Sequence, residues 1–471
     1  MNHKLVTTLL LLIGAWNSVS AESPNFLFLL SDDQHWAGLS CQMHPDLEQS
    51  RNELIDTPSL ARLANEGMRF SAAYSPASVC SPTRVSLQTG KSPAQMNWTK
   101  AAPTMTAADN YPLISPTINK RLPTEEVTIG NQLQSVGYRT AHYGKWHLGR
   151  IDPTSYGYDE SDGPTGNQTA EPFVEPNPVD IFGMGERAVA FMQKSKEEGK
   201  PFFIQMSYHA LHYPENATAA TVAKYRERGV QNPGSMAIAD DMDRGIGELL
   251  ESLDRLGLSQ TTYVIFMADN GGNAGRNIRL LRGGKGGVWE GGIRVPMIVR
   301  GPGVTPGSWS HQRVVGYDWY PTFCALAGVE TPLPSGIEGG TIMHLLKGVD
   351  EPVQRPRQEL VFHFPHYQSD APHTALFLGK YKLFRFYEDR SYQLYDLQQD
   401  LGESANIADA NPEVVRAMAE RMDRYLADVG AKFPTVNSSY DPSKPSSSNT
   451  SKKKGGGKGG KPKGKGKGKK N

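Results

Sequence analysis

Short apolar runs alternate with amphipathic segments along most of the chain. The first run, residues 25–30 (Asn-Phe-Leu-Phe-Leu-Leu), lies between turn signals, which is typical of a strand buried on both faces of a parallel sheet. Residues 57–67 place Pro in the first turn, apolar residues at helical spacing and a closing Gly, so they predict a helix. The same reading predicts further strands at residues 68–74, 138–143, 201–207, 262–268 and 295–300, and helices at 128–136, 236–256 and 318–327.

This alternation predicts an α/β fold with a mostly parallel sheet flanked by helices. From about residue 346 the pattern changes to short alternating runs, followed by an amphipathic segment at 412–429. We therefore predict a main domain at 22–345 and a smaller C-terminal α+β subdomain at 346–435, made of an antiparallel sheet and a helix. The predicted strands of this sheet are residues 359–364, 374–378, 381–386 and 391–395.

The two ends of the chain differ from its body. Residues 1–21 combine Lys4, an apolar stretch and the small residues Val19-Ser20-Ala21, which predicts a cleaved signal peptide rather than an uncleaved anchor. The mature chain would then be exported, to the periplasm or the medium, with no integral membrane segment. Residues 436–471, Ser/Pro-rich and then Lys/Gly-rich, predict a disordered tail. That tail is either a solvated extension or a basic contact to polyanionic envelope or glycan.

The overall charge hides an asymmetry. The chain has 50 Lys+Arg and 49 Asp+Glu, but residues 452–471 hold ten Lys and residues 1–21 one Lys, with no acid in either. The body therefore carries 39 basic and 49 acidic side chains, which argues against a nucleic-acid partner. A hydrophobic share of 38% excludes a disordered chain.

Three cysteines, Cys41, Cys80 and Cys324, are too few and too scattered for a disulfide framework, and there is no Cys-x-x-Cys motif. An odd number leaves at least one thiol to explain. Cys80 begins Cys-Ser-Pro-Thr-Arg, continued by Leu87-Gln88-Thr89-Gly90. Cys80 is either a small buried thiol or a reactive group, and a thiolate nucleophile would need a lowered pKa and a nearby base.

Polar clusters follow three predicted strands directly, where the active sites of parallel sheets lie. Two of these clusters offer only hard oxygen ligands, in Asp32, Asp33, Asp269 and Asn270. Such ligands suit Ca²⁺ or Mg²⁺ rather than zinc or copper. The alternative is that each Asp only caps a following helix.

The remaining candidates are basic. Lys145 and His147 follow a strand two residues apart, so both project from one face if the chain stays extended. His209 and His212 lie in Tyr-His-Ala-Leu-His-Tyr-Pro, and Lys285 lies in a Gly-rich run without P-loop spacing. With Arg84, these groups would form a positive pocket in an acidic body.

Taken in order, these motifs resemble the type I sulfatase family, the formylglycine-dependent, arylsulfatase-like branch of the alkaline phosphatase superfamily. Cys-x-Pro-x-Arg alone fixes three positions, but the similarity extends over roughly residues 24–440. It includes Asp32-Asp33, Gly144–Gly149, Ala268–Gly272, Leu281–Gly286, Trp289–Pro296, Leu394–Leu397 and Asp400–Glu403. The resemblance implies an alkaline-phosphatase-like fold, with a sulfatase catalytic domain at 22–345, and the hydrolysis of sulfate esters, R–O–SO₃⁻.

The resemblance also implies how Cys80 acts. A maturation enzyme that reads Pro82 and Arg84 would convert Cys80 to Cα-formylglycine. One hydroxyl of the aldehyde hydrate would attack sulfur, and the other would later expel the sulfate. One Ca²⁺ would be bound by Asp32, Asp33, Asp269, Asn270 and an oxygen of residue 80, with Gln34 a less certain neighbour. The residue types alone do not exclude Mg²⁺.

Roles for the basic residues follow from the same resemblance. Lys145 would bind sulfate and the formylglycine oxygens, Arg84 would hold the hydrate, and His147 would be the base, for which an ordinary His pKa of ~6.5 is suitable. Lys285 would contact the sulfate and the bridging oxygen. His212 aligns with the family's leaving-group acid, although Leu211 replaces an expected Pro and leaves His209 as the alternative.

Export favours a sulfated carbohydrate as substrate, with aryl sulfates also turned over. Residues 97–122, 152–180 and 363–373 are the segments expected to contact the sugar, with His363 and His366 as substrate-binding residues and Tyr367 beside them; ordinary loop packing is the alternative. Two other functions stay open. One is a phosphomonoesterase, phosphodiesterase or phosphonate hydrolase of the same superfamily, and the other is a non-catalytic protein that binds sulfated glycans.

Overall fold

The computed structural model describes residues 23–101, 110–167, 175–272 and 280–444, and its centre is an eight-stranded sheet. The strand order is β10-β2-β9-β8-β1-β7-β5-β6, and β1 pairs in parallel with both β7 and β8. Two pairings, β2 with β9 and β9 with β8, are antiparallel. The strands are β1 (Asn25–Ser31), β2 (Met68–Phe70), β5 (Arg139–Gly144), β6 (Glu160–Ser161), β7 (Phe202–Ser207), β8 (Thr262–Ala268), β9 (Met297–Arg300) and β10 (Ser308–Ser310).

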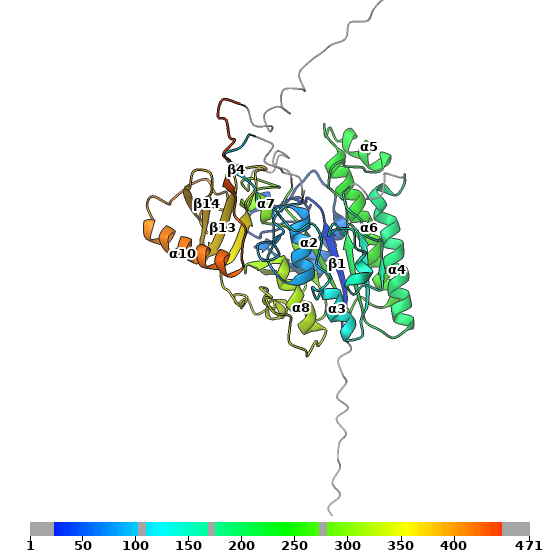
Figure 1. The fold of residues 1–471 in the computed structure, drawn as a ribbon. Coiled ribbons are helices and arrows are strands. Elements are labelled where there is room, and N and C mark those ends of the chain that lie inside the picture. Colours follow the sequence, from blue (N-terminus) through cyan, green and yellow to red (C-terminus); the bar gives the residue numbers. More distant parts are fainter. Residues whose placement is uncertain (1–22, 102–109, 168–174, 273–279, 445–471) are drawn as a thin grey trace, which may run out of the picture.

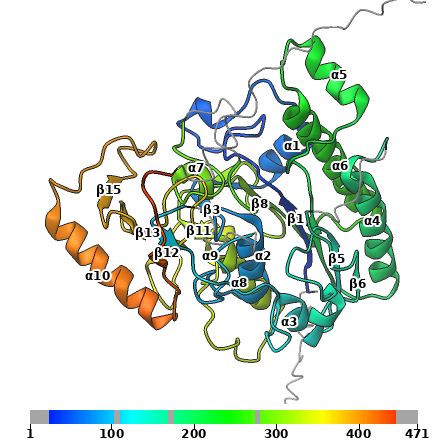
Figure 2. The same ribbon diagram turned by 45° about the horizontal axis from the view of Figure 1, so that its top comes forward.

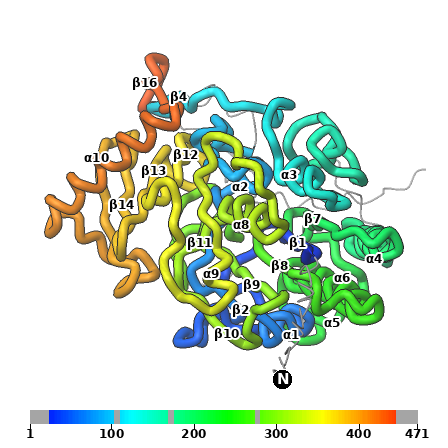
Figure 3. Tube along the Cα trace, turned by 90° about the horizontal axis from the view of Figure 1, so that it is seen from below, coloured from blue at the N-terminus to red at the C-terminus, as the bar shows by residue number. Residues whose placement is uncertain are grey.

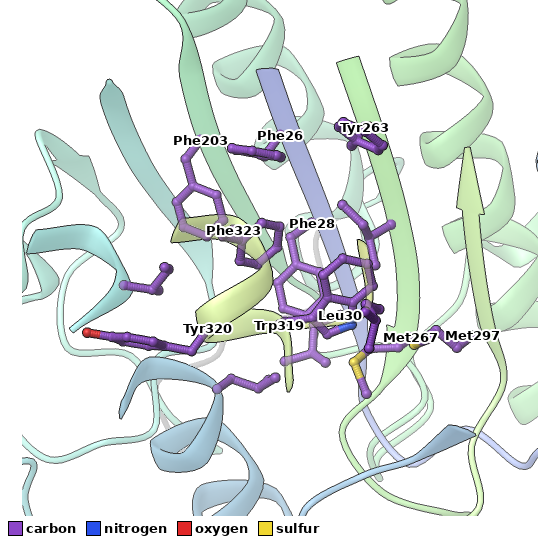
Figure 4. Close-up of a cluster of buried hydrophobic side chains, with 14 of the residues drawn as sticks. Phe26, Phe28, Leu30, Phe203, Tyr263, Met267, Met297, Trp319, Tyr320 and Phe323 are labelled. Carbon is purple, nitrogen blue, oxygen red and sulfur yellow. The ribbon is translucent and has the colours of Figure 1, made fainter. Parts of the chain in front are cut away.

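Helices cover both faces of this sheet, and β1 shows why. Its side chains alternate, so Phe26, Phe28 and Leu30 pack into one hydrophobic cluster while Leu27 and Leu29 pack into another. The first cluster lies against α2 (Cys80–Thr89), α3 (Ile129–Ser135) and α8 (Trp319–Leu326), and Figure 4 shows Phe28 and Phe323 meeting there. The second lies against α1 (Pro58–Glu66), α4 (Ile181–Glu197) and α6 (Gly234–Leu256), with α5 (Ala219–Glu227) beyond. Helices α4, α5 and α6 are on the right in Figure 1.

A second, antiparallel sheet of four strands forms the C-terminal part. One face packs on α10 (Pro412–Asp428) through Met418 and Met422, and the other face packs on the main domain through Phe362 and Phe384. Figures 2 and 3 show α10 on the outer side of this sheet, away from α4 and α6. The strands are β12 (Leu360–Phe364), β13 (His373–Leu378), β14 (Tyr381–Phe386) and β15 (Tyr392–Asp396).

Short elements complete the chain. Strand β3 (Ala73–Tyr74) pairs in parallel with β11 (Val314–Val315), and β4 (Leu113–Ile114) pairs antiparallel with β16 (Thr435–Val436). The short α-helices are α7 (Glu290–Ile293) and α9 (Met343–Leu346), and the 3₁₀ helices span Glu48–Ser50, Pro153–Tyr156, Pro178–Asp180 and Gly316–Asp318.

The predicted α/β class, with its antiparallel C-terminal sheet and helix, is confirmed. Several details differ from prediction. The single strand expected at 68–74 is broken into β2 and β3, which belong to different sheets. Helices α2, α4 and α5 were not predicted. The tail expected to be disordered from residue 436 is ordered up to Lys444, because Asn437 and Asp441 bond to residues 110–112. The division at 345/346 stays a prediction.

The predicted signal peptide and the Lys/Gly repeats lie outside the described residues. Within the described ranges, no helix combines the length and the hydropathy needed to cross a membrane.

Candidate active site

The carboxyl ends of four neighbouring strands bring the polar clusters together. The amide of Asp269, after β8, donates to the carbonyl of Ser31 at the end of β1 over 2.9 Å. On the other side of β1, the amide of Lys145, after β5, donates to the carbonyl of Ser207 in β7 over 2.8 Å. Asp32, Asp33, Lys145, Asp269 and Asn270 therefore share one edge of the sheet, and all five are buried.

Cys80 is the first residue of α2, and its side chain is 1% exposed. Its Sγ and one carboxylate oxygen each of Asp32 and Asp269 all lie within 4.8 Å of one another. The sulfur marks the place that formylglycine oxygens would take. An N-terminal helix position favours negative charge, because the first backbone N–H groups have no partner within the helix.

Arg84 lies one helical turn after Cys80 and is 2% exposed, so its ion pairs are buried. Its Nη2 is 2.7 Å from Asp269 Oδ2 and 3.4 Å from Asp32 Oδ2. Its Nη1 donates to the carbonyl of Lys145 over 2.5 Å. Arg84 therefore connects α2 to the ends of β1, β5 and β8.

Two lysines balance the remaining carboxylate charge. Lys145 Nζ bonds to Asp32 Oδ2, and Lys285 Nζ lies 2.7 Å from the Asp33 carboxylate. With Arg84, three cations face the three aspartates. Burial alone would raise the pKa of Asp32, but the charges of Lys145 and Arg84 outweigh burial and hold that pKa well below its ordinary value.

The pKa of Asp269 shifts in the direction opposite to that of Asp32. Burial, with the charge of Asp32 next to it, raises the pKa of Asp269 to about 7. A divalent cation between these carboxylates would remove that penalty, because it offsets their mutual repulsion.

The donor set fits a hard cation. Among the described residues, Asp32 Oδ1 and Asn270 Oδ1 are buried oxygens without a hydrogen-bond partner. Asn270 Nδ2 is already engaged, because it donates to Asp33 Oδ1 over 2.7 Å. Buried oxygens left unpaired cost free energy unless a ligand satisfies them, and carboxylate and amide oxygens are the ligands of Ca²⁺ and Mg²⁺.

The backbone turns sharply where Lys145 and His147 lie, so the extended chain expected there is wrong. Gly144 has φ 84° and His147 has φ 58°. His147 still lies within the electrostatic reach of Lys145. Burial, reinforced by the charge of Lys145, lowers the pKa of His147 well below its ordinary value, which keeps the imidazole neutral.

His209 and His212 have adjacent rings, with centroids 5.1 Å apart. A ring nitrogen of His212 lies within 4.8 Å of carboxylate oxygens of Asp32 and Asp33, and His212 Nδ1 is 2.7 Å from the carbonyl of Tyr213. His209 is 6% exposed, and neither of its ring nitrogens has a hydrogen-bond partner in the part of the chain that the structure describes. Burial lowers the pKa of His209 to about 3, and it also lowers the pKa of His212.

The two histidines predicted to contact the sugar, His363 and His366, differ in how many of their ring nitrogens have hydrogen-bond partners. His363 lies in β12, where Nδ1 meets Thr374 Oγ1 at 2.6 Å and Nε2 meets the carbonyl of Lys432 at 2.9 Å. Both ring nitrogens are therefore occupied, which favours packing over substrate binding for His363. His366 is 2% exposed and shares Nε2 with Thr99 Oγ1 at 2.7 Å, while its Nδ1 has no partner. Residues 102–109 and 168–174 of the expected contact segments lie outside the described residues.

Sequence reasoning missed two features of this site. Helix α2 carries Cys80 and Arg84, and its signals were Pro82 in the first turn and Gly90, with φ 67°, at the C-cap. Gln34 was only a tentative neighbour, yet its side chain is fully buried and its Oε1 has no hydrogen-bond partner.

Comparison with known proteins gives two family matches. Residues 24–329 match the family described as sulfatase, and residues 284–429 match the one described as N-sulphoglucosamine sulphohydrolase, C-terminal. Arylsulfatase A of Homo sapiens is 31% identical over an alignment that covers 88% of this chain and 89% of the relative. N-acetylgalactosamine-6-sulfatase of Mus musculus is 30% identical, with 73% and 71% covered.

Among solved structures, Ps i-CgsB in complex with k-i-k-neocarrahexaose superposes with a TM-score of 0.72 at 25% identity. The match covers 86% of this chain and 93% of that one. The family match over residues 24–329 includes Asp32, Cys80 and Asp269.

Proposed function

The chain belongs to the sulfatase family and is a sulfuric ester hydrolase, and we propose that it desulfates carbohydrates, with aryl sulfates as small substrates. One observation carries the assignment of the site: Cys80 Sγ meets the carboxylates of Asp32 and Asp269 within 4.8 Å, at the start of a helix and beside buried cations. The carbohydrate class is supported by relatives, one named N-acetylgalactosamine-6-sulfatase and another bound to k-i-k-neocarrahexaose.

We propose that Cys80 is converted to formylglycine by a maturation enzyme that reads Pro82 and Arg84. Burial raises the pKa of the Cys80 thiol, so an unmodified side chain would contain little thiolate. The aldehyde of formylglycine would add water to give a hydrate, which has two hydroxyl groups on one carbon in place of the thiol. Arg84, fixed by Asp269 and the Lys145 carbonyl, would hold that carbon's oxygens in one orientation.

The proposed cation is one Ca²⁺, held by Asp32, Asp33, Asp269, Asn270 and residue 80. When bound, Ca²⁺ draws charge from sulfate oxygens and lowers the pKa of a neighbouring hydroxyl. Asp32 and Asn270 each keep one unpartnered oxygen for it. Because the three aspartates are already balanced by Arg84, Lys145 and Lys285, an added cation would leave the site positive toward an anionic sulfate.

Different side chains of the protein would accept and donate the protons of the reaction. His147, neutral because of burial, would accept a proton from a hydroxyl of residue 80. Lys145 and Lys285 would bind the sulfate oxygens as charge develops on them. His212 bonds to the Tyr213 carbonyl through Nδ1, so Nε2 is the atom that would protonate the leaving oxygen, with His209 the alternative acid.

Three further assignments belong to this proposal. The chain would be exported after removal of residues 1–21. Residues 22–345 would form the catalytic domain and 346–435 the C-terminal subdomain, while the Lys/Gly-rich segment would contact polyanionic envelope or glycan. His366, next to Thr99, would contact substrate.

The test compares 4-nitrophenyl sulfate with 4-nitrophenyl phosphate, and mass spectrometry of the peptide over residues 71–91 reports the state of Cys80. We expect formylglycine in the peptide and faster sulfate hydrolysis. A much faster phosphate reaction would favour the phosphoesterase alternative. Fully converted protein that binds sulfated glycan without releasing sulfate would favour the glycan-binding alternative.

A further inference from the structure

Below the candidate active site, helix α2 is joined to the central sheet by a chain of buried polar side chains. Gln88 Nε2 donates to Oε1 of Gln205, in β7, over 2.9 Å, and Gln205 Nε2 donates to Ser207 Oγ over 3.1 Å. Ser207 Oγ lies 3.2 Å from Nε2 of His142, in β5, and the Tyr158 hydroxyl donates to Gln88 Oε1 over 2.9 Å. We call these five side chains the polar network, and each is at most 2% exposed.

The polar network lies where apolar side chains would otherwise pack. Phe203, two residues before Gln205 on the same face of β7, belongs to the hydrophobic cluster against α2. Replacing a whole set of hydrogen-bond partners by apolar groups of the same shape is often nearly neutral for stability. What hydrogen bonds add to apolar packing is direction, because they need both a short distance and a favourable angle. The polar network is therefore better explained by the placement of α2 than by stability.

Gln88 shares one face of α2 with the two residues that the proposed mechanism uses there. Cys80, Arg84 and Gln88 follow one another at intervals of four, and side chains at that spacing lie on the same side of a helix. Arg84 bonds to the carbonyl of Lys145, and Gln88 bonds to Gln205. The helix is thus tied to the sheet at two points about 6 Å apart along its axis. Two such points fix both the axial position and the rotation of α2, and with them the position of Cys80.

The other end of the polar network supports the turn that carries Lys145 and His147. The backbone carbonyl of Ser207 accepts the amide N–H of Lys145 over 2.8 Å. The ring of His142 packs edge-on against Trp146, which lies between Lys145 and His147, with centroids 5.0 Å apart. Burial lowers the pKa of His142 to about 3, so this ring is neutral wherever the protein is folded near neutral pH. One set of hydrogen bonds therefore connects the carrier of residue 80 with the turn that holds the proposed base.

We propose that the polar network positions the reacting groups of the site against one another, and that Gln88 is its central positioning residue. The inference rests on the proposed roles of residue 80, Arg84, Lys145 and His147. Gln88 bonds to Gln205 and Tyr158, so it acts on the reaction through the placement of α2. A misplacement of reacting groups by about 1 Å can lower a rate about a hundredfold.

The first test is Gln88→Met, which keeps the length of the side chain and its helix propensity but removes both amide bonds. On 4-nitrophenyl sulfate with calcium present, we expect kcat to fall about tenfold and KM to change less than about twofold, because the displaced groups act in the transition state. Each rate is divided by the share of residue 80 found as formylglycine in the peptide over residues 71–91, so that a change in maturation is not counted. A kcat within about threefold of wild type would overturn the inference.

A second variant separates positioning from damage to the core, because Gln88→Met leaves Gln205 and Tyr158 each without one hydrogen-bond partner. Gln88→Met/Tyr158→Phe/Gln205→Met replaces all three side chains by apolar ones of similar shape, and Ser207 keeps its contact with His142. We expect a higher melting temperature than for Gln88→Met, with kcat still more than about threefold below wild type. A smaller loss of kcat would show that apolar packing is sufficient to place α2, and would overturn the inference. The triple variant also carries the test if Gln88→Met does not fold.

The matched control is Thr140→Val, two residues before His142 on the same face of β5. Thr140 is fully buried, and its hydroxyl donates to the carbonyl of Gly157 over 2.8 Å, away from the carboxyl end of the strand. Losing this bond should lower the melting temperature and leave kcat unchanged. A loss of kcat as large as that of Gln88→Met would overturn the positioning role. Wild-type protein that contains formylglycine and releases no sulfate would instead contradict the proposed function, so the two failures are distinguishable.

Discussion

Two buried clusters of charge can be compared in this protein. The site cluster consists of Asp32, Asp33, Asp269, Arg84, Lys145 and Lys285. The subdomain cluster consists of Glu290, Arg294, Lys382 and Glu403, and it joins the main domain to the C-terminal sheet. Lys382, in β14 and 0% exposed, has Nζ 2.9 Å from Glu290 and 2.7 Å from Glu403. Arg294 pairs with Glu290 at 2.7 Å, and the Glu290 amide donates to Glu403 Oε2.

Both clusters are buried, and each contains a carboxyl group with a raised pKa. They differ in how fully their side-chain oxygens are paired. Burial raises the pKa of Asp269 in one and of Glu403 in the other, each to about 7, so a raised pKa does not separate function from structure. In the subdomain cluster, Glu403 Oε1 lies in an ion pair with Lys382, although the geometry is not that of a hydrogen bond. In the site cluster, Asp32 Oδ1 and the oxygen of the adjoining Asn270 side chain have no hydrogen-bond partner among the described residues. Two such hard oxygens at one edge of the sheet, rather than buried charge, favour the site cluster as the place for a cation.

The largest expected effect breaks the site cluster. Cys80→Ala and Asp269→Ala should each lower kcat for 4-nitrophenyl sulfate by at least about a thousandfold, because each removes a group around which transition-state charge is stabilised. Steady-state kinetics with calcium present measures this. Residual turnover above about a tenth of wild type in either variant would contradict the assigned site.

Breaking the subdomain cluster should affect stability instead. Lys382→Met leaves Glu290 and Glu403 buried with less compensation, and we expect the free energy of unfolding to fall by about 3–5 kcal/mol. Urea denaturation measures it. The control is Lys380→Met, which removes an ion pair between Asp396 and a solvent-exposed lysine and should leave the free energy of unfolding almost unchanged. Similar losses in both variants would argue that burial does not matter here.

Adding and removing calcium tests which of the two clusters binds the ion. A Ca²⁺ concentration of about 100 times Kd should stabilise the wild type by about 2.7 kcal/mol, because the ion binds the folded chain. Chelation should reverse this gain and abolish turnover. Asp269→Ala should lose most of the calcium-dependent shift in melting temperature, whereas Lys382→Met should keep it. If Lys382→Met lost the calcium-dependent shift and Asp269→Ala kept it, the ion would bind in the subdomain cluster instead.

The pH dependence of stability tests Glu403. Its pKa is raised by burial from an ordinary 4.5 to about 7, so the folded chain binds more protons than the unfolded chain between these values. This contribution to the free energy of unfolding is present below about pH 4.5 and is lost as the pH rises through about 7. Glu403→Gln should therefore lose less stability than wild type between pH 5 and pH 8 in urea titrations. A wild type that gains stability relative to this variant would refute the direction of the shift.

The smallest effect lies outside both clusters. Deletion of residues 452–471 should leave the rate on 4-nitrophenyl sulfate within about twofold of wild type, because a Lys/Gly repeat has no apolar side chains to pack. A larger change would mean that these lysines act on small substrates. The truncation should instead weaken binding to anionic glycan, more at low salt than at high salt.

Local patterns in the sequence were sufficient for the fold class and for the family. Residues 262–268 and 381–386 were predicted with the bounds that β8 and β14 have. The continuous apolar run of β8 reports directly that this strand is buried. Helix α2 escaped this reasoning, since all ten of its residues are buried although six of them are polar, so hydrophobicity does not follow burial along it.

What the sequence determined by itself is which residues carry the chemistry: Cys80 with Pro82 and Arg84, and the polar residues that follow the strands. Only the tertiary structure decided how their charges are partnered, because Arg84 meets Asp269 across 185 positions and Lys285 meets Asp33 across 252. The burial of one segment can be predicted from its own hydrophobic pattern. Which oxygen stays unpaired depends on every neighbour that folding brings to it.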